Sequence, residues 1–129
     1  MRFISILAAG SLLMATSAYA ASPQPEKEIA AAATHAGLAA ESPDINQVHM
    51  HLHHALNCLV GPNGEGYSAK DMDPCSALGN GLLADATGKN QMIGVNAAIV
   101  SAKAGLAATD LEKAKAEAAA TKATLDTIK

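Results

Sequence analysis

The histidines of this chain lie close together in the sequence: they are His35, His49, His51, His53 and His54. Four of the five fall within the stretch VHMHLHHALNC, residues 48–58. On a helix, residues four apart stand on the same face, so His49 and His53 have the spacing with which one helix presents two imidazoles to one metal ion. Imidazole nitrogens are good ligands for Cu(II), Zn(II) and Ni(II). The cluster therefore predicts a transition-metal site.

His35 lies on the other side of an expected helix–helix turn that is centred near Ser42. It precedes that centre by seven residues, and His49 follows it by seven. At about 1.5 Å per residue, both would stand roughly 10 Å from the turn, at the same height on adjacent antiparallel helices. We therefore expect His35, His49 and His53 to share one metal ion. The less favoured ligand candidates are His51, His54 and the thioether of Met50, which prefers Cu(I).

An alternative interpretation is that the histidines are solvated surface groups or respond to pH. The second half of the chain provides an internal comparison, because an equivalent hairpin there carries other residues at the matching positions. These are Lys103, Lys115 and Ala119, opposite His35, His49 and His53. The scaffold therefore does not require imidazole at these places for structural reasons.

The two cysteines, Cys58 and Cys75, are expected to form a disulfide. It would close a loop of about 17 residues, which is worth roughly 3 kcal/mol if the stabilisation comes from chain entropy. The alternative is that both are thiolate ligands of a soft metal. An oxidising compartment favours the disulfide.

The first twenty residues have the features of an export signal. Arg2 is followed by an apolar run, and Ala18–Ala20 form a small-x-small cleavage site. The expected product is one domain, residues 21–129, in the periplasm or secreted. No later run is apolar enough to cross a membrane, and loss of Arg2 shifts the formal charge from −3 to −4. We therefore expect no membrane span and no nucleic-acid partner.

A repeat organises the rest of the chain. The sequence AGLAA occurs at 36–40 and again at 104–108, and a similar apolar rhythm follows each copy. Alanine is abundant and β-branched residues are sparse, which favours helix. We therefore predict an all-α four-helix bundle made of two duplicated helical hairpins, 24–60 and 89–128. Residues 61–88 would be a crossover loop tied to the first hairpin by the disulfide.

Local signals suggest where these helices begin. Ser42 is a candidate cap for the second helix, with Pro43 at its first position. In the second hairpin, Thr109 and Glu112 have the spacing of a capping box. A short helix could start at Asp73 and reach the mid-80s, although glycines weaken it.

Motifs for several other functions are absent from the sequence. There is no C-x-x-C-H, no G-x-S-x-G, no H-E-x-x-H and no Walker loop, and the carboxylates are scattered. We therefore do not expect an enzyme. Two alternatives to metal binding remain open. One is a structural or interaction protein that meets a protein partner through residues 61–88. The other is a non-covalent haem b carrier, for which the methionine candidates are Met50, Met72 and Met92.

The stretch ATHAGLAAESPDINQVHMHLHHAL resembles the small periplasmic metal-binding proteins of bacteria, which are His-bearing, Ala-rich four-helix bundles with an export signal. In that family histidines recur through the whole chain, whereas here they are confined to the first hairpin. The resemblance implies divalent-metal ligation, with copper favoured and zinc or nickel as alternatives, by His35, His49 and His53. The expected role is metal buffering or delivery.

Overall fold

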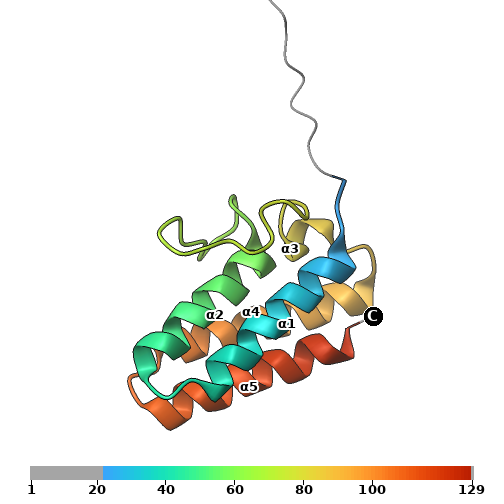
Figure 1. Ribbon diagram of the computed structural model, residues 1–129. Coiled ribbons are helices and arrows are strands. Elements are labelled where there is room, and N and C mark those ends of the chain that lie inside the picture. Colours follow the sequence, from blue (N-terminus) through green and yellow to red (C-terminus); the bar gives the residue numbers. More distant parts are fainter. Residues whose placement is uncertain (1–21, 129) are drawn as a thin grey trace, which may run out of the picture.

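The computed structural model describes residues 22–128, which fold into helices joined by turns and one long loop, without a strand in that range. The helices are α1 (Pro25–Glu41), α2 (Ile45–Val60), α3 (Leu82–Asp85), α4 (Lys89–Ala107) and α5 (Leu111–Thr127). The four long helices form a bundle in which α1 and α4 each pack against both α2 and α5 (Figure 1). The predicted all-helical bundle is confirmed. The expected export signal lies outside the described residues.

The turn between α1 and α2 is capped by an aspartate. The carboxylate of Asp44 accepts hydrogen bonds from the backbone N–H groups of Asn46, at 2.9 Å, and Gln47, at 3.1 Å. Ser42, the cap expected from the sequence, instead closes α1, because its hydroxyl donates to the carbonyl of Leu38 at 2.8 Å. The helix therefore begins two residues later than expected, beyond Pro43.

The turn between α4 and α5 repeats this arrangement. Asp110 caps α5, and its carboxylate accepts from the backbone N–H of Lys113 at 2.9 Å. The capping residue is therefore Asp110 rather than Thr109. In both hairpins the sequence offered a hydroxyl and a carboxylate within two residues of each other, and the carboxylate sits at the cap.

The core of the bundle is built from a few leucines surrounded by small residues. The larger buried side chains include Leu52, Leu56, Leu59, Leu82 and Leu125. Ten of the other buried positions are alanines, namely Ala32, Ala33, Ala36, Ala39, Ala55, Ala98, Ala102, Ala108, Ala114 and Ala118. Such small side chains allow the helices to approach closely. At Gly105 the approach leaves no room for a methyl group, because a Cβ there would lie 2.6 Å from Cδ1 of Leu52.

The loop after α2 is tied back to that helix. The predicted disulfide between Cys58 and Cys75 is present, and both residues are buried. Beside it, the buried amide of Asn57 donates to the carbonyls of Ser68 and Met72, at 3.0 and 3.2 Å, and accepts from the N–H of Ser68 at 2.8 Å. The loop thus has a fixed position along the last turn of α2.

The helix expected from Asp73 to the mid-80s is shorter than predicted. Only α3 is helical, and residues 74–78 form turns. Gly81, which precedes α3, has a φ of 97°, in the region that favours glycine. This backbone reversal prevents a continuous helix across the segment.

Candidate metal centre

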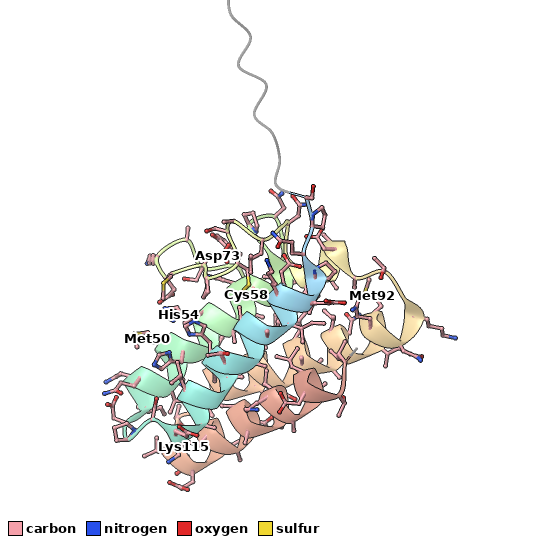
Figure 2. All side chains as sticks on the ribbon, turned by 45° about the vertical axis from the view of Figure 1, so that its right-hand side comes forward. Met50, His54, Cys58, Asp73, Met92 and Lys115 are labelled. Carbon is pink, nitrogen blue, oxygen red and sulfur yellow. A yellow bond between two sulfur atoms is a disulfide. The ribbon has the colours of Figure 1, made fainter. Side chains whose placement is uncertain are left out.

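Three imidazoles converge on the outer side of the bundle, between α1 and α2. They belong to His35 of α1 and to His51 and His54 of α2, and one nitrogen of each lies within 4.8 Å of the others. The Nδ1 atoms of His35 and His51 are 3.4 Å apart. The ring centroids are separated by 5.0 Å (His35–His54), 5.6 Å (His51–His54) and 5.7 Å (His35–His51). Figure 2 shows His54 on the side of α2 that borders α1. The three rings therefore form a compact triangle.

These separations match the dimensions of a metal site with three imidazole ligands. Zinc–imidazole bonds measure about 2.0–2.1 Å, which places two nitrogens of a tetrahedral site roughly 3.3 Å apart. Adjacent ligands of a square-planar ion would be closer, at about 2.9 Å. Rings bound to one tetrahedral or trigonal ion have centroids roughly 5–5.5 Å apart. The arrangement of His35, His51 and His54 fits the tetrahedral or trigonal case.

The surroundings favour the neutral, metal-binding form of these side chains. Burial lowers the pKa of His35, and the neighbouring His54 and His51 lower it further. Burial, followed by His51, also lowers the pKa of His54, and the nearby carboxylate of Asp71 opposes this shift. A neutral imidazole has a free lone pair, which a metal ligand requires. Both imidazoles are therefore mainly neutral at pH 7, which is the form that can bind a metal ion.

His54 also contains a buried polar atom without a partner. Its side chain is largely buried, with 6% of the residue surface exposed. Its Nδ1 atom has no hydrogen-bond partner among the described residues. Nδ1 of His53 is also buried without a partner, so this property is not specific to the imidazole triangle.

The other two predicted ligands lie elsewhere. Nε2 of His49 is 3.0 Å from the carbonyl oxygen of Ala108, which places it against the turn between α4 and α5. Nδ1 of His53 lies 3.9 Å from a carboxylate oxygen of Asp71, in the loop after α2. The structure therefore brings His35 together with His51 and His54, and it does not bring His35, His49 and His53 together as expected.

The direction of side chains on antiparallel helices explains part of this difference. Each Cα–Cβ bond of a helix tilts toward the N-terminus of that helix. Side chains of α1 therefore lean away from the connecting turn, and those of α2 lean toward it. His35 consequently meets residues of α2 that lie farther from the turn than His49. Equal sequence distances from Ser42 gave the wrong pairing because they ignore this tilt.

The two flanks of α2 explain the rest. His51 and His54 stand on one side of its buried apolar stripe, and His49 and His53 stand on the other. The first flank faces α1, and the second faces the α4–α5 turn and the loop. Which flank of α2 meets α1 depends on the handedness of the bundle. The spacing of the histidines along α2 is the same for either handedness, so it cannot indicate which flank faces α1.

The methionines do not form a set around the histidines. Met50 lies one helical turn before His54 and is partly exposed (Figure 2). Met72 is exposed on the loop, and Met92 belongs to α4, well away from His54 (Figure 2). Of the two methionines labelled in Figure 2, Met50 lies nearer to His54 than Met92 does.

A second group of potential ligands consists of Cys58, Asp73 and Cys75. The two sulfur atoms are bonded to each other in the disulfide. They are therefore not thiolate ligands in this form of the protein. The alternative assignment of the cysteines to a soft metal does not describe this structure.

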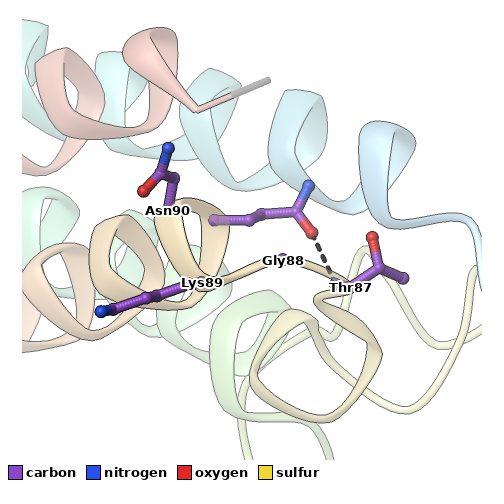
Figure 3. Close-up of a pocket in the computed structure, with 5 residues that line it drawn as sticks. Thr87, Gly88, Lys89 and Asn90 are labelled. Carbon is purple, nitrogen blue, oxygen red and sulfur yellow. Dashed lines mark hydrogen bonds between the residues drawn. The ribbon is translucent and has the colours of Figure 1, made fainter.

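The hollow in Figure 3 lies apart from the histidines, at the start of α4. It is lined by Thr87, Gly88, Lys89, Asn90 and Gln91. The backbone N–H of Thr87 donates to the side-chain oxygen of Gln91 at 2.9 Å. Its lining contains no imidazole, thiol or carboxylate, so it adds no metal ligand.

Two buried carboxyl groups form a feature that the sequence did not reveal. Glu28 of α1 is fully buried, and one of its oxygens accepts from the N–H of Gly81 at 3.2 Å. Asp85 of α3 is also buried and accepts from the backbone and side chain of Asn80. A Cβ at Gly79 would lie 2.1 Å from one carboxyl oxygen of Asp85 and 2.7 Å from one of Glu28. The two groups therefore border the same small space. Burial, and then the charge of Asp85, raises the pKa of Glu28 to about 7.

Comparison of the chain with models of protein families, with curated proteins and with solved structures finds no match. Among the helices of residues 22–128, none combines the length and the apolar character that crossing a membrane requires.

Proposed function

We propose that the protein binds one transition-metal ion through His35, His51 and His54, and that it buffers or delivers this ion. The observation that carries the proposal is the mutual spacing of the three imidazoles, with ring centroids 5.0–5.7 Å apart. This spacing is set by the packing of α1 on α2. The ligands would therefore need little rearrangement to hold an ion.

Copper, in the Cu(I) state, and zinc are the metals that this set of ligands would suit best. Both accept imidazole ligands in the tetrahedral or trigonal geometry that matches the 3.4 Å separation of His35 and His51. Tetragonal Cu(II) would require the nitrogens to move closer together. The resemblance to periplasmic metal-binding proteins implies a divalent ion, which within this pair is Zn(II), whereas the copper that it favours would bind here as Cu(I).

The accessibility of the site supports buffering or delivery rather than permanent storage. His35 and His51 are partly exposed at the surface of the bundle, whereas a structural ion is normally enclosed by a complete set of ligands. Three protein ligands also leave a position that an acceptor could fill. The disulfide agrees with an oxidising compartment, which supports the expected export of the protein.

The test is a titration with Zn(II) and with Cu(I) that compares alanine variants of histidines on the two flanks of α2. His51→Ala should lose the one-to-one complex, and His35→Ala should behave in the same way. His49→Ala and His53→Ala are the matched controls, because they remove an imidazole from the same hairpin and should bind normally. Equal loss in all four variants, or normal binding by His35→Ala and His51→Ala, would contradict the proposed ligands.

A further inference from the structure

The outward side of α4 carries apolar side chains that are largely exposed. Ile93 and Val100 are 59% and 68% exposed, more than any other large apolar residue in the described part of the chain. They are seven residues apart, and Ala97 lies exposed between them. From Ile93 onward, the residues on this side follow the alternating spacing of four and three that is typical of helices packed in pairs. We call them the α4 stripe: Lys89, Ile93, Ala97, Val100, Ala104 and Ala107.

The opposite side of α4 is already used inside the bundle. Val95, Ala98, Ile99 and Ala102 are buried there. A helix that is apolar on both sides is usually buried on both sides. By contrast, exposed charged residues lie on the outer sides of α1 and α5, for example Lys27 and Lys113. The α4 stripe is therefore the surface of the bundle that most resembles an interface.

We propose that the α4 stripe is the interface of a homodimer, in which the α4 helices of two copies pack antiparallel. A two-fold interface must be self-complementary, with residue i facing residue j and residue j facing residue i. One antiparallel register satisfies this condition. It places Ile93 opposite Ala104 of the second copy, and Val100 opposite Ala97 of the second copy. Each large side chain then meets a small one, as efficient packing requires.

Charge favours the same arrangement. Lys89, at the start of α4, would lie beside the end of α4 in the second copy. That end has no basic residue in its last turn, and the exposed Asp110 follows it. A lysine is stabilised by the partial negative charge at a helix C-terminus. Parallel packing would instead place the two Lys89 side chains against each other.

The proposed interface is separate from the metal site. The imidazole triangle lies between α1 and α2, and α4 contributes no histidine. Figure 1 shows α4 on the far side of the bundle from α1. Dimerisation therefore leaves the imidazoles of both copies accessible, and it does not depend on metal binding.

The test is the molar mass of the purified protein, measured by light scattering and sedimentation over a range of concentrations. A chelator is present throughout so that metal ions cannot join two copies. We expect a dimer for the unchanged chain and a monomer for Val100→Glu. Met72→Glu is the matched control, because it also places a charge at an exposed apolar side chain, 57% exposed on the loop, and it should remain dimeric.

Circular dichroism establishes that both variants are folded. A monomeric unchanged chain at millimolar concentration would overturn the proposal, and so would a Val100→Glu variant that remains dimeric.

Lys89→Gln tests the relative orientation of the two α4 helices. It should weaken an antiparallel dimer by roughly 3- to 30-fold, because two contacts with helix ends are lost. A tighter dimer would indicate parallel packing and would overturn the proposed register. Lys27→Gln on α1 should leave the dimer unchanged.

Discussion

The Nδ1 atoms of His35 and His51 lie 3.4 Å apart, although the two residues are separated by sixteen positions in the sequence. At this distance the rings can share one hydrogen bond or hold one ion. They cannot both carry a proton on Nδ1 without the two N–H groups opposing each other. Protons and metal ions should therefore compete for the same atoms.

Metal affinity should be insensitive to pH above neutrality and should fall in acid. The pKa values of His35 and His54 are lowered by burial and by neighbouring imidazoles, so both rings are neutral at pH 7. Their protonation begins to oppose binding only below the usual histidine pKa of about 6.5. Competition titrations with Zn(II) at several pH values measure this effect. An affinity that already falls between pH 8 and pH 7 would be inconsistent with rings that are neutral at pH 7.

Replacement of Glu28 by glutamine should stabilise the protein in alkaline solution. The pKa of Glu28 is raised from 4.5 to about 7, first by burial and then by the charge of Asp85. The folded state therefore binds more protons than the unfolded state between these values, and the free energy of unfolding falls as the pH rises through this range. Above pH 7 the folded state bears the full free-energy cost of ionising the buried carboxyl group of Glu28. Glu28→Gln removes it, and should gain roughly 2–3 kcal/mol at pH 8 and little at pH 4.

Urea unfolding at the two pH values measures this difference. Glu26→Gln is the control, because Glu26 is an exposed carboxylate in the same turn of α1 and should change the stability little at either pH. A stability gain of Glu28→Gln that is the same at pH 4 and pH 8 would show that ionisation of Glu28 is not its cause.

Replacement of Asn57 by alanine should release the loop from α2. The buried amide of Asn57 bonds to the backbone of Ser68 and Met72, and the change leaves these groups without their partner. We expect a loss of about 2–4 kcal/mol, since each unsatisfied buried group costs about 1–3 kcal/mol. Limited proteolysis should cleave the variant between residues 61 and 74. The exposed Asn46→Ala should resist cleavage like the unchanged chain, and equal resistance of Asn57→Ala would argue against this role.

A methyl group at Gly105 should destabilise the bundle, although alanine is the better helix former. Its Cβ would lie 2.6 Å from Cδ1 of the buried Leu52 and 3.2 Å from Cβ of Glu117. Overpacking of this kind typically costs about 1–3 kcal/mol. Gly94→Ala is the comparison, because its Cβ would meet only the side chain of Ile128, near the end of α5, which can move. Thermal unfolding should rank Gly105→Ala below Gly94→Ala, and the reverse order would contradict this account.

Much of the fold could be predicted because its determinants are local. Alanine content and apolar spacing predicted the four long helices, and the two cysteines predicted the disulfide. The exact caps could not be predicted, because Ser42 and Asp44 are both good capping residues and the packing of the turn selects Asp44. The extent of α3 was overestimated because Gly81 takes a backbone conformation that the residue types alone do not impose.

The clustering of the histidines could be predicted, but which of them lie together could not. The clustering of the histidines could be read directly from the sequence. The position of the turn then predicted that His35 would lie beside histidines of the second helix. The choice between His49 and His51 required the tilt of side chains on both helices and the hand of the bundle. The pairing of Glu28 with Asp85 was also beyond the sequence, because 57 positions separate these residues and a glycine turn brings them together.

All three imidazoles of the triangle come from the first hairpin, which is one continuous segment of 36 residues from Pro25 to Val60. Contacts between neighbouring helices form rapidly, because only a short loop must close. The ligands can therefore meet before the second hairpin has folded against the first. A metal ion captured at that stage would hold α1 and α2 in register, and would act as a template on which the later helices assemble.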